Sequence, residues 1–257
     1  MREVQGLVKR YGGVVALTGL TVSVGAGECL ILLGRNGAGK TTALRCMAGV
    51  LAPSAGTVRV DGIDSTSEPA EVRARVGLMP ELPGLYERMS ARTYLDYFGE
   101  IYDVEPQTRR RRIESLLELF DLTDAADRWL GSYSKGMRQK VALIRATLHH
   151  PRLVLADEPT SALDPDSAHR AWAYLKDLQR EGCALVVCTH NMEEAETLAG
   201  EIGIMSGGRA LAVGDLPELR KQSGLPARKE LVELPNLQDI YLAIVSNHRE
   251  LAESRSA

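Results

Sequence analysis

The chain has 257 residues, a formal net charge of −3 and 44% hydrophobic residues, a composition typical of a soluble globular protein. The charge argues against a nucleic-acid partner, because nucleic-acid-binding proteins usually carry a strong basic excess. The longest apolar runs, at 29–33 and 184–188, are far shorter than the roughly 20 residues that span a bilayer, and charged Arg2 and Glu3 stand where a signal peptide would begin, so we expect a soluble, cytosolic protein.

The first part of the chain alternates short strands with glycine-containing turns. The run at 29–33 is apolar throughout, as expected for a parallel strand that is buried on both faces. Asp61-Gly62 is a hairpin-turn signal. In chain order, the pattern predicts strands at 4–8, 20–24, 29–33, 57–60 and 75–79, with a helix at 40–49.

A glycine-rich segment follows the buried strand and opens the predicted helix. It fits the pattern G-x-x-x-x-G-K-[ST], in which backbone N–H groups at a helix N-terminus bind phosphate oxygens and glycines allow close approach. Lys40 adds a positive charge for the β- and γ-phosphates, and the Thr41 hydroxyl can bind Mg²⁺. A glycine-rich turn without a ligand is the alternative, but it fits the strand–loop–helix context less well. We therefore predict that a nucleoside triphosphate is bound by Gly34, Arg35, Asn36, Gly37, Ala38, Gly39, Lys40, Thr41 and Thr42.

The middle of the chain has helical periodicity and interrupts the strand-rich part. Apolar residues recur at helix spacing from about 82 to 151, which predicts an inserted helical lobe. Strands are predicted again at 153–156, 184–189 and 201–205, with a helix at 165–181. Strands that alternate with helices of this length predict an α/β fold with a mostly parallel sheet, beside a small antiparallel β part.

The chain after Gly214 is broken by prolines and is predicted to form an appendage, 216–257. Its last helix is expected at 237–251. Most simply, the apolar stripe of this helix packs against the chain itself; the alternative is that it helps to hold a dimer. The stripe consists of Leu237, Ile240, Tyr241, Ile244 and Val245.

Two carboxylates stand at the end of the strand at 153–156. Asp157 and Glu158 would be costly there unless they meet a cation, and Mg²⁺ is the natural partner beside a phosphate loop. Asp157 is predicted to hold Mg²⁺, directly or through water, and Glu158 to act as general base on the attacking water. The alternative is a solvated strand end followed by a helix cap. Asp164, directly before Pro165, has the local signature of an N-cap.

In their order along the chain, these motifs resemble those of the ATP-binding subunit of ABC transporters, over about residues 3–215. Tyr11 resembles the aromatic residue that stacks on adenine, and His190 the switch histidine that senses the γ-phosphate, although alone it would be interpreted as a structural residue. Residues 134–139 resemble a variant signature motif, and 161–164 resemble the D-loop. A GTPase is excluded, because the chain has no Asn-Lys-x-Asp motif.

Two departures from the family pattern indicate a subgroup. Lys135 replaces the first glycine of the usual Leu-Ser-Gly-Gly-Gln, but Ser134 and Gly136 remain to contact the γ-phosphate. Glu81 stands where the family has its Q-loop glutamine; it can bind Mg²⁺ but cannot donate a hydrogen bond. Both departures resemble the ATPases that serve ABC-2-type exporters. The alternatives are an importer ATPase, which the segment 11–17 would also suit, and a soluble ABC ATPase without a role in transport.

The resemblance implies a P-loop NTPase (RecA-type) core with an inserted helical lobe, and a reaction shared by two subunits. ATP and Mg²⁺ would lie between the phosphate loop of one copy and Ser134 and Gly136 of another, with Asp164 taking part in the dimer switch. The expected partners are a second copy or a paralogous ATPase subunit, and a separate integral-membrane permease that docks near 82–97. The protein would then lie peripherally on the cytoplasmic face of the cell membrane.

Two clusters of basic residues have plainer interpretations. His149 and His150 are expected to be solvated at a helix C-terminus, where positive charge is favoured. The run 109–112 consists of four arginines and is predicted to be a solvated helix face, since acidic residues follow at helical spacing. Contact of this run with anionic lipid is the alternative.

Overall fold

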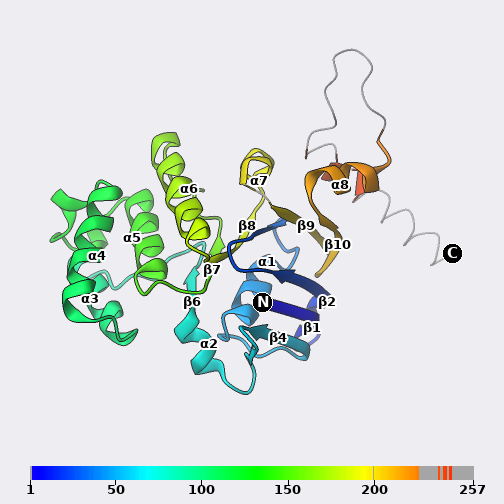
Figure 1. Ribbon diagram of the computed structural model, residues 1–257, viewed down its shortest axis with the longest axis horizontal. Coiled ribbons are helices and arrows are strands. Elements are labelled where there is room, and N and C mark those ends of the chain that lie inside the picture. Colours follow the sequence, from blue (N-terminus) through cyan, green and yellow to red (C-terminus); the bar gives the residue numbers. More distant parts are fainter. Residues whose placement is uncertain (1, 199, 226–236, 238–239, 242, 245–257) are drawn as a thin grey trace, which may run out of the picture.

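The computed structural model describes residues 2–198, 200–225, 237, 240–241 and 243–244. In this part of the chain the larger sheet has the strand order β10-β9-β3-β8-β7-β6 (Figure 1). Every neighbouring pair in it is parallel except β10 with β9. The strands are β3 (Cys29–Leu33), β6 (Val76–Met79), β7 (Leu153–Asp157), β8 (Ala184–Thr189), β9 (Glu201–Ser206) and β10 (Arg209–Gly214).

The smaller sheet is antiparallel throughout, in the order β2-β1-β4-β5. Its first two strands are longer than predicted, because the pair Gly12-Gly13 makes a two-residue hairpin turn that brings Tyr11 opposite Val14. Its strands are β1 (Arg2–Tyr11), β2 (Val14–Val24), β4 (Ala55–Val60) and β5 (Ile63–Asp64).

Helix α1 (Lys40–Met47) packs against strands of both sheets. Alternate residues of β3 explain this layering. Leu30 and Leu32 belong to the core shared with α1 and the smaller sheet, whereas Ile31 and Leu33 belong to the core on the other face. The strand is therefore buried on both sides, as its unbroken apolar sequence predicts.

The helices between β6 and β7 form the inserted lobe, which lies to one side of the sheets (left in Figure 1). Among the described residues, no helix is both long enough and apolar enough to cross a bilayer. The remaining helices are α2 (Pro69–Arg75), α3 (Ala91–Ile101), α4 (Pro106–Leu119), α5 (Lys135–Thr147), α6 (Pro165–Arg180), α7 (Met192–Leu198) and α8 (Leu216–Ser223).

Several of these elements differ from the sequence predictions. Arg75, predicted as the first residue of a strand, ends α2 instead. The sequence reasoning did not predict α2, α7, α8 or β10. For α8 a local signal existed, because Asp215 and Glu218 form a capping box at its start. The predicted helix at 237–251 lies largely outside the described residues.

The apolar stripe of that predicted helix is described at four of its five positions. Leu237, Ile240, Tyr241 and Ile244 are buried in the core that also holds β3 and the lobe, so these side chains pack against the chain itself. Val245 lies outside the described residues.

The expectation of a solvated His149 is wrong. Its ring stacks on Tyr102, with the ring centroids 3.8 Å apart and the planes 7° from parallel. Burial lowers the pKa of His149 to about 4, so the ring is neutral at physiological pH. Desolvation outweighs the preference of a helix C-terminus for positive charge. His150, by contrast, is exposed.

The arginine run is solvated only in part. Arg109 donates to Asp96 of α3 at 2.7 Å, and Arg112 donates to the carbonyl oxygen of Leu148, at the end of α5, at 3.0 Å. Two of the four arginines thus connect α4 to the neighbouring helices of the lobe, while Arg110 and Arg111 are exposed.

Candidate active site

The glycine-rich loop leaves β3 at Leu33 and enters α1 at Lys40. The N-cap of α1 is Gly39, with φ of 99°, and no side chain caps the helix. A Cβ on Gly39 would come within 2.7 Å of the carbonyl oxygen of Ala16, and one on Gly34 within 2.6 Å of that of Met205. The loop therefore needs glycine at both positions, and the uncapped helix start offers N–H groups to an anion.

The Lys40 side chain folds back over this loop. Its ammonium is buried and donates to the carbonyl oxygens of Gly34, at 2.6 Å, and Arg35, at 3.4 Å. The positive charge is therefore in place before a phosphate group arrives. A phosphate oxygen can replace these carbonyl oxygens with a stronger, charge-assisted hydrogen bond.

Asp157 meets Thr41 at the end of β7. The Thr41 hydroxyl donates to the buried Asp157 carboxylate at 2.6 Å. Burial raises the pKa of Asp157 above its ordinary value, and the negative charges of Glu158 and Glu81 add to this effect. A divalent cation would offset both causes.

The residues fit Mg²⁺ by their donor chemistry. A hydroxyl and a carboxylate oxygen are the hard ligands that Mg²⁺ prefers, and this ion usually keeps several waters or phosphate oxygens as its other ligands. The described residues contain no group of three or more His, Cys, Asp or Glu side chains that could hold a metal. Glu81 is exposed and acts on Asp157 through its charge.

Glu158 has an unusual backbone conformation. Its φ is 51°, the left-handed region, which costs a non-glycine residue about 1–2 kcal/mol. Hydrogen bonds from both sides stabilise it: its N–H donates to the carbonyl oxygen of Cys188 at 2.9 Å, and its carbonyl oxygen accepts from Gln139 Nε2 at 2.6 Å. Glu158 thus turns out of the sheet directly after Asp157.

The Glu158 side chain points to the end of β8. Its Oε1 lies 2.7 Å from His190 Nδ1, and its Oε2 accepts from the Thr189 hydroxyl at 3.4 Å. The carboxylate is buried, whereas the His190 ring is 63% exposed. This arrangement suits a general base: hydrogen-bonding partners align the buried carboxylate, and the exposed imidazole beside it is accessible to a ligand.

A cleft of about 490 Å³ lies beside these groups. The phosphate loop forms one wall through Gly34, Arg35 and Asn36, and His190 forms another. Tyr241 also lines the cleft, a position that its predicted place in an apolar stripe did not indicate. The structure therefore brings the phosphate loop, the carboxylates of Asp157 and Glu158, and His190 to the carboxyl ends of β3, β7 and β8.

Other candidate residues lie around this centre. Tyr11, 45% exposed, stands at the hairpin turn between β1 and β2, with Lys9 Nζ 5.3 Å from the centre of its ring. Asp164 caps α6 by accepting from the Ser167 N–H at 2.9 Å, and hydrogen bonds from Ser167 lower the pKa of Asp164 to about 2. The N-cap prediction for Asp164 is confirmed.

Ser134 and Gly136 are built into a different helix start. Ser134 caps α5 by accepting from the Met137 N–H at 3.2 Å. A Cβ on Gly136 would lie 2.8 Å from the carbonyl oxygen of Ala162, so α5 begins against the loop that follows Glu158. In Figure 1, α5 lies in the lobe and α1 in the centre of the molecule.

Gln139 is a residue whose role the sequence reasoning missed. It is almost fully buried on α5. Its amide donates to Glu158 and accepts from the Ala162 N–H at 3.0 Å. It therefore connects α5 to both ends of the segment after β7, a contact between residues far apart in the chain.

The sequence profile of the family described as "ABC transporter" matches residues 17–161. The ABC transporter ATP-binding protein NatA of Bacillus subtilis is 40% identical over 207 residues, which are 80% of this chain and 84% of NatA. The daunorubicin resistance ATP-binding protein DrrA2 of Streptomyces coeruleorubidus is 36% identical over 98% of this chain and 80% of its own length. The Nod factor export ATP-binding protein I of Ralstonia nicotianae is 38% identical over 84% and 68%.

Solved structures share the fold. The structure described as the ATP-binding subunit of an ABC transporter has a TM-score of 0.88 and 29% sequence identity, covering 95% of this chain and 99% of that one. A dimeric ATP-binding cassette in a post-hydrolysis state, bound to ADP and Pi, has a TM-score of 0.78 and 25% identity, covering 84% and 99%.

Proposed function

This chain belongs to the ABC transporter family as an ATP-binding, ATP-hydrolysing subunit, and from that premise we propose that it powers an exporter through residues on both helix starts. Its core is that of a P-loop NTPase. The observation that carries the proposed mechanism is the position of Glu158, turned out of the sheet beside Asp157 and paired with His190.

We assign ATP to the phosphate loop, residues 34–42, with Tyr11 against the adenine. The N–H groups at the start of α1 and the Lys40 ammonium hold the β- and γ-phosphates. Thr41 and Asp157 hold Mg²⁺, with Glu81 contributing negative charge nearby. When bound, Mg²⁺ neutralises charge that develops on the phosphate oxygens.

Glu158 acts as the general base in this proposal. Its carboxylate takes a proton from the water that attacks the γ-phosphate, while His190 holds the carboxylate from its exposed side. Because the backbone of Glu158 is fixed by both β8 and Gln139, the carboxylate is aligned before ATP binds.

The site is completed by a second subunit. Ser134 and Gly136 open α5, whereas the phosphate loop opens α1, and they suit the γ-phosphate of a neighbouring copy. A similar cassette forms a dimer with ADP and Pi bound. The second subunit is a copy of this chain or a paralogous ATPase subunit, and Asp164 responds to its approach.

A permease of separate sequence is the proposed membrane partner. The lobe carries an exposed apolar cluster in which the ring of Tyr86 touches Tyr94, Tyr97 and Phe98. Exposed apolar patches of this kind on a soluble domain mark interaction sites. Docking there places the protein peripherally on the cytoplasmic face of the membrane. The exposed members of the cluster are Tyr86 and Tyr97, and Leu82 and Ile101 are further exposed apolar residues of the lobe.

Export is favoured by the names of the relatives, one of which serves Nod factor export and another daunorubicin resistance. Glu81 and Lys135, the departures that resemble the ABC-2-type exporter subgroup, agree with this direction. We assign the ATP-binding domain to residues 3–215, with its lobe at about 82–151, and an appendage to 216–257.

The Glu158→Gln variant tests this function. Glutamine keeps the shape of the side chain but cannot accept the proton, so hydrolysis should fall about 100- to 1,000-fold while ATP still binds. Under saturating Mg-ATP the variant should elute from a size-exclusion column as a dimer. Unchanged hydrolysis would overturn the role of Glu158, and a monomer with bound ATP would overturn the shared site.

A further inference from the structure

Helix α7 contributes a second carboxylate beside the catalytic strand ends. Glu194 Oε1 accepts from the Thr160 hydroxyl at 2.5 Å, and Glu194 Oε2 accepts from the Thr189 hydroxyl at 3.4 Å. Thr160 lies two residues after Glu158, and Thr189 directly before His190. The Glu194 side chain therefore connects the segments that follow β7 and β8, the two strands after which Glu158 and His190 stand.

The Thr189 hydroxyl stands between two carboxylates. Its oxygen lies 3.4 Å from Glu158 Oε2 and 3.4 Å from Glu194 Oε2, and it accepts from the Asn191 N–H at 2.9 Å. A hydroxyl has one proton to donate, so the two glutamates share it. Glu194 thus holds part of that proton, and its removal would change the hydrogen bond from Thr189 to Glu158.

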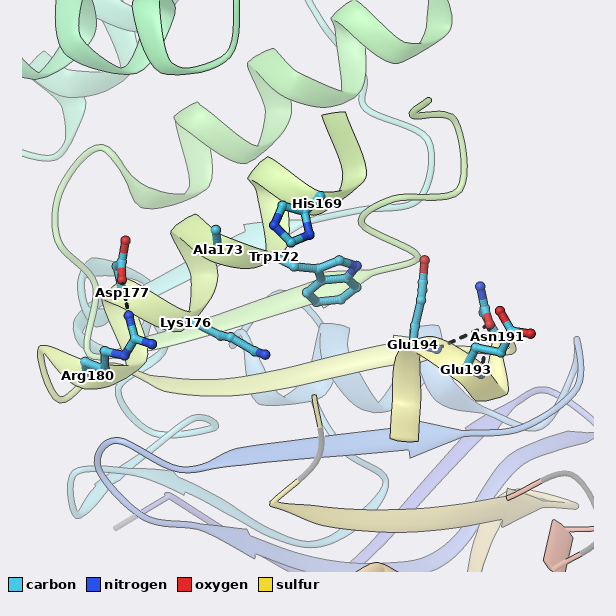
Figure 2. Close-up of a pocket in the computed structure, with 9 residues that line it drawn as sticks. All are labelled: His169, Trp172, Ala173, Lys176, Asp177, Arg180, Asn191, Glu193 and Glu194. Carbon is cyan, nitrogen blue, oxygen red and sulfur yellow. Dashed lines mark hydrogen bonds and ion pairs between the residues drawn. The ribbon is translucent and has the colours of Figure 1, made fainter. Parts of the chain in front are cut away.

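The first turn of α7 sets the direction of Glu194. Asn191 Oδ1 accepts from the N–H groups of Glu193 and Glu194, at 3.1 and 3.4 Å, and so fixes the helix start. The neighbouring Glu193 side chain is exposed, whereas Glu194 is half-buried. Figure 2 shows the two glutamates projecting from α7 in different directions.

An open pocket lies on the other side of Glu194. It measures about 500 Å³ and separates α7 from Trp172 and Lys176 of α6 (Figure 2). Glu194 therefore borders open space as well as the two hydroxyls. Its truncation would extend an existing pocket and leave the apolar core intact, so a role in folding and a role in catalysis can be separated.

We propose that Glu194 is a positioning residue for ATP hydrolysis: through Thr160 and Thr189 it holds the Glu158 carboxylate in line for the attacking water. The inference rests on the proposed role of Glu158 as general base. Glu158 sits in a strained backbone conformation, and such a conformation persists only where the surrounding structure holds it. Glu194 supplies part of that support through the two threonines, and it does not line the cleft beside the phosphate loop.

Three single variants and one control test the proposal in the full chain. Glu194→Ala and Thr189→Val should each lower kcat about 10- to 100-fold, with KM for ATP and nucleotide affinity within about two-fold of the wild type, because only alignment is lost. Thr189→Ser keeps the hydroxyl and should retain most of the activity. The exposed neighbour variant Glu193→Gln is the matched control and should hydrolyse ATP at the wild-type rate.

A double variant shows whether Glu194 acts through Glu158. In a Glu158→Gln background, Glu194→Ala should lower the residual rate less than about two-fold, since the group that it positions is already lost. If Glu158→Gln alone hydrolyses ATP normally, the proposed function fails. If Glu158→Gln is inactive but Glu194→Ala keeps wild-type kcat, or loses ATP affinity and melting temperature together with kcat, the positioning role fails and the proposed function stands.

Discussion

The two helix starts proposed to bind phosphate, at α1 and at α5, differ in the partners that their side chains already have. At α1, Lys40 and Thr41 already have hydrogen-bond partners in the loop and on β7. At α5, Ser134 caps its own helix, and Gly136 packs on the backbone of the segment after Glu158. In the proposed function, the first start binds ATP in a single chain, whereas the second binds the nucleotide of another subunit.

The Lys40→Ala variant should have the largest effect on this comparison, because it removes the charge from the assembled side. Lys40 is buried and donates to two loop carbonyls, so the loop also loses part of its internal support. We expect nucleotide affinity to fall about 100-fold or more, measured by titration calorimetry. An affinity within two-fold of the wild type would show that α1 does not depend on its lysine.

Gly136→Ala should impair the other side and leave ATP binding by the single chain intact. The new Cβ would come within 2.8 Å of the Ala162 carbonyl oxygen, so the start of α5 must shift. Turnover should fall about 10-fold, and the ATP-dependent dimer of the Glu158→Gln variant should weaken. Gly84→Ala is the matched control, because nothing lies within 4 Å of its Cβ position. A loss of single-chain affinity would contradict the division between the two helix starts.

Glu81→Gln should have the smallest effect. Glu81 is exposed and influences Asp157 through charge, so its neutralisation should lower the pKa of Asp157 slightly and leave the Thr41–Asp157 pair in place. We expect kcat within about three-fold of the wild type and a similar Mg²⁺ requirement in a metal titration. An inactive variant would instead assign a specific acidic role to Glu81.

The assembled side could be predicted from the sequence because its signals are local. An unbroken apolar strand, a glycine-rich loop and Lys40-Thr41 follow one another within fourteen positions, and each residue type has one strong structural reason to be there. Asp157 and Glu158 were found in the same way, at the end of a second apolar run. The strands of the larger sheet other than β10 were predicted from apolar runs of the same kind.

The hydrogen bonds that align the catalytic groups could not be predicted in this way. Gln139 and Thr189 reach Glu158 from positions 19 and 31 residues away, and in sequence they look like ordinary polar residues. A glutamate with positive φ has no local signal, since asparagine, aspartate or glycine would be expected there. The start of α7 was missed because His190 was interpreted as part of a motif, and the capping role of Asn191, next to it, was not considered.

The lobe cannot be removed as an independent unit, because it is also the crossover connection between two parallel strands, β6 and β7. β6 and β7 are parallel neighbours in the sheet. The chain that leaves the carboxyl end of β6 must therefore return to the opposite end of the strands before β7 begins. Helix α5 forms this return connection and packs against β6. A shortened ATPase must therefore retain α5. Sequence changes in this lobe are likewise constrained by the helix that also carries Ser134 and Gln139.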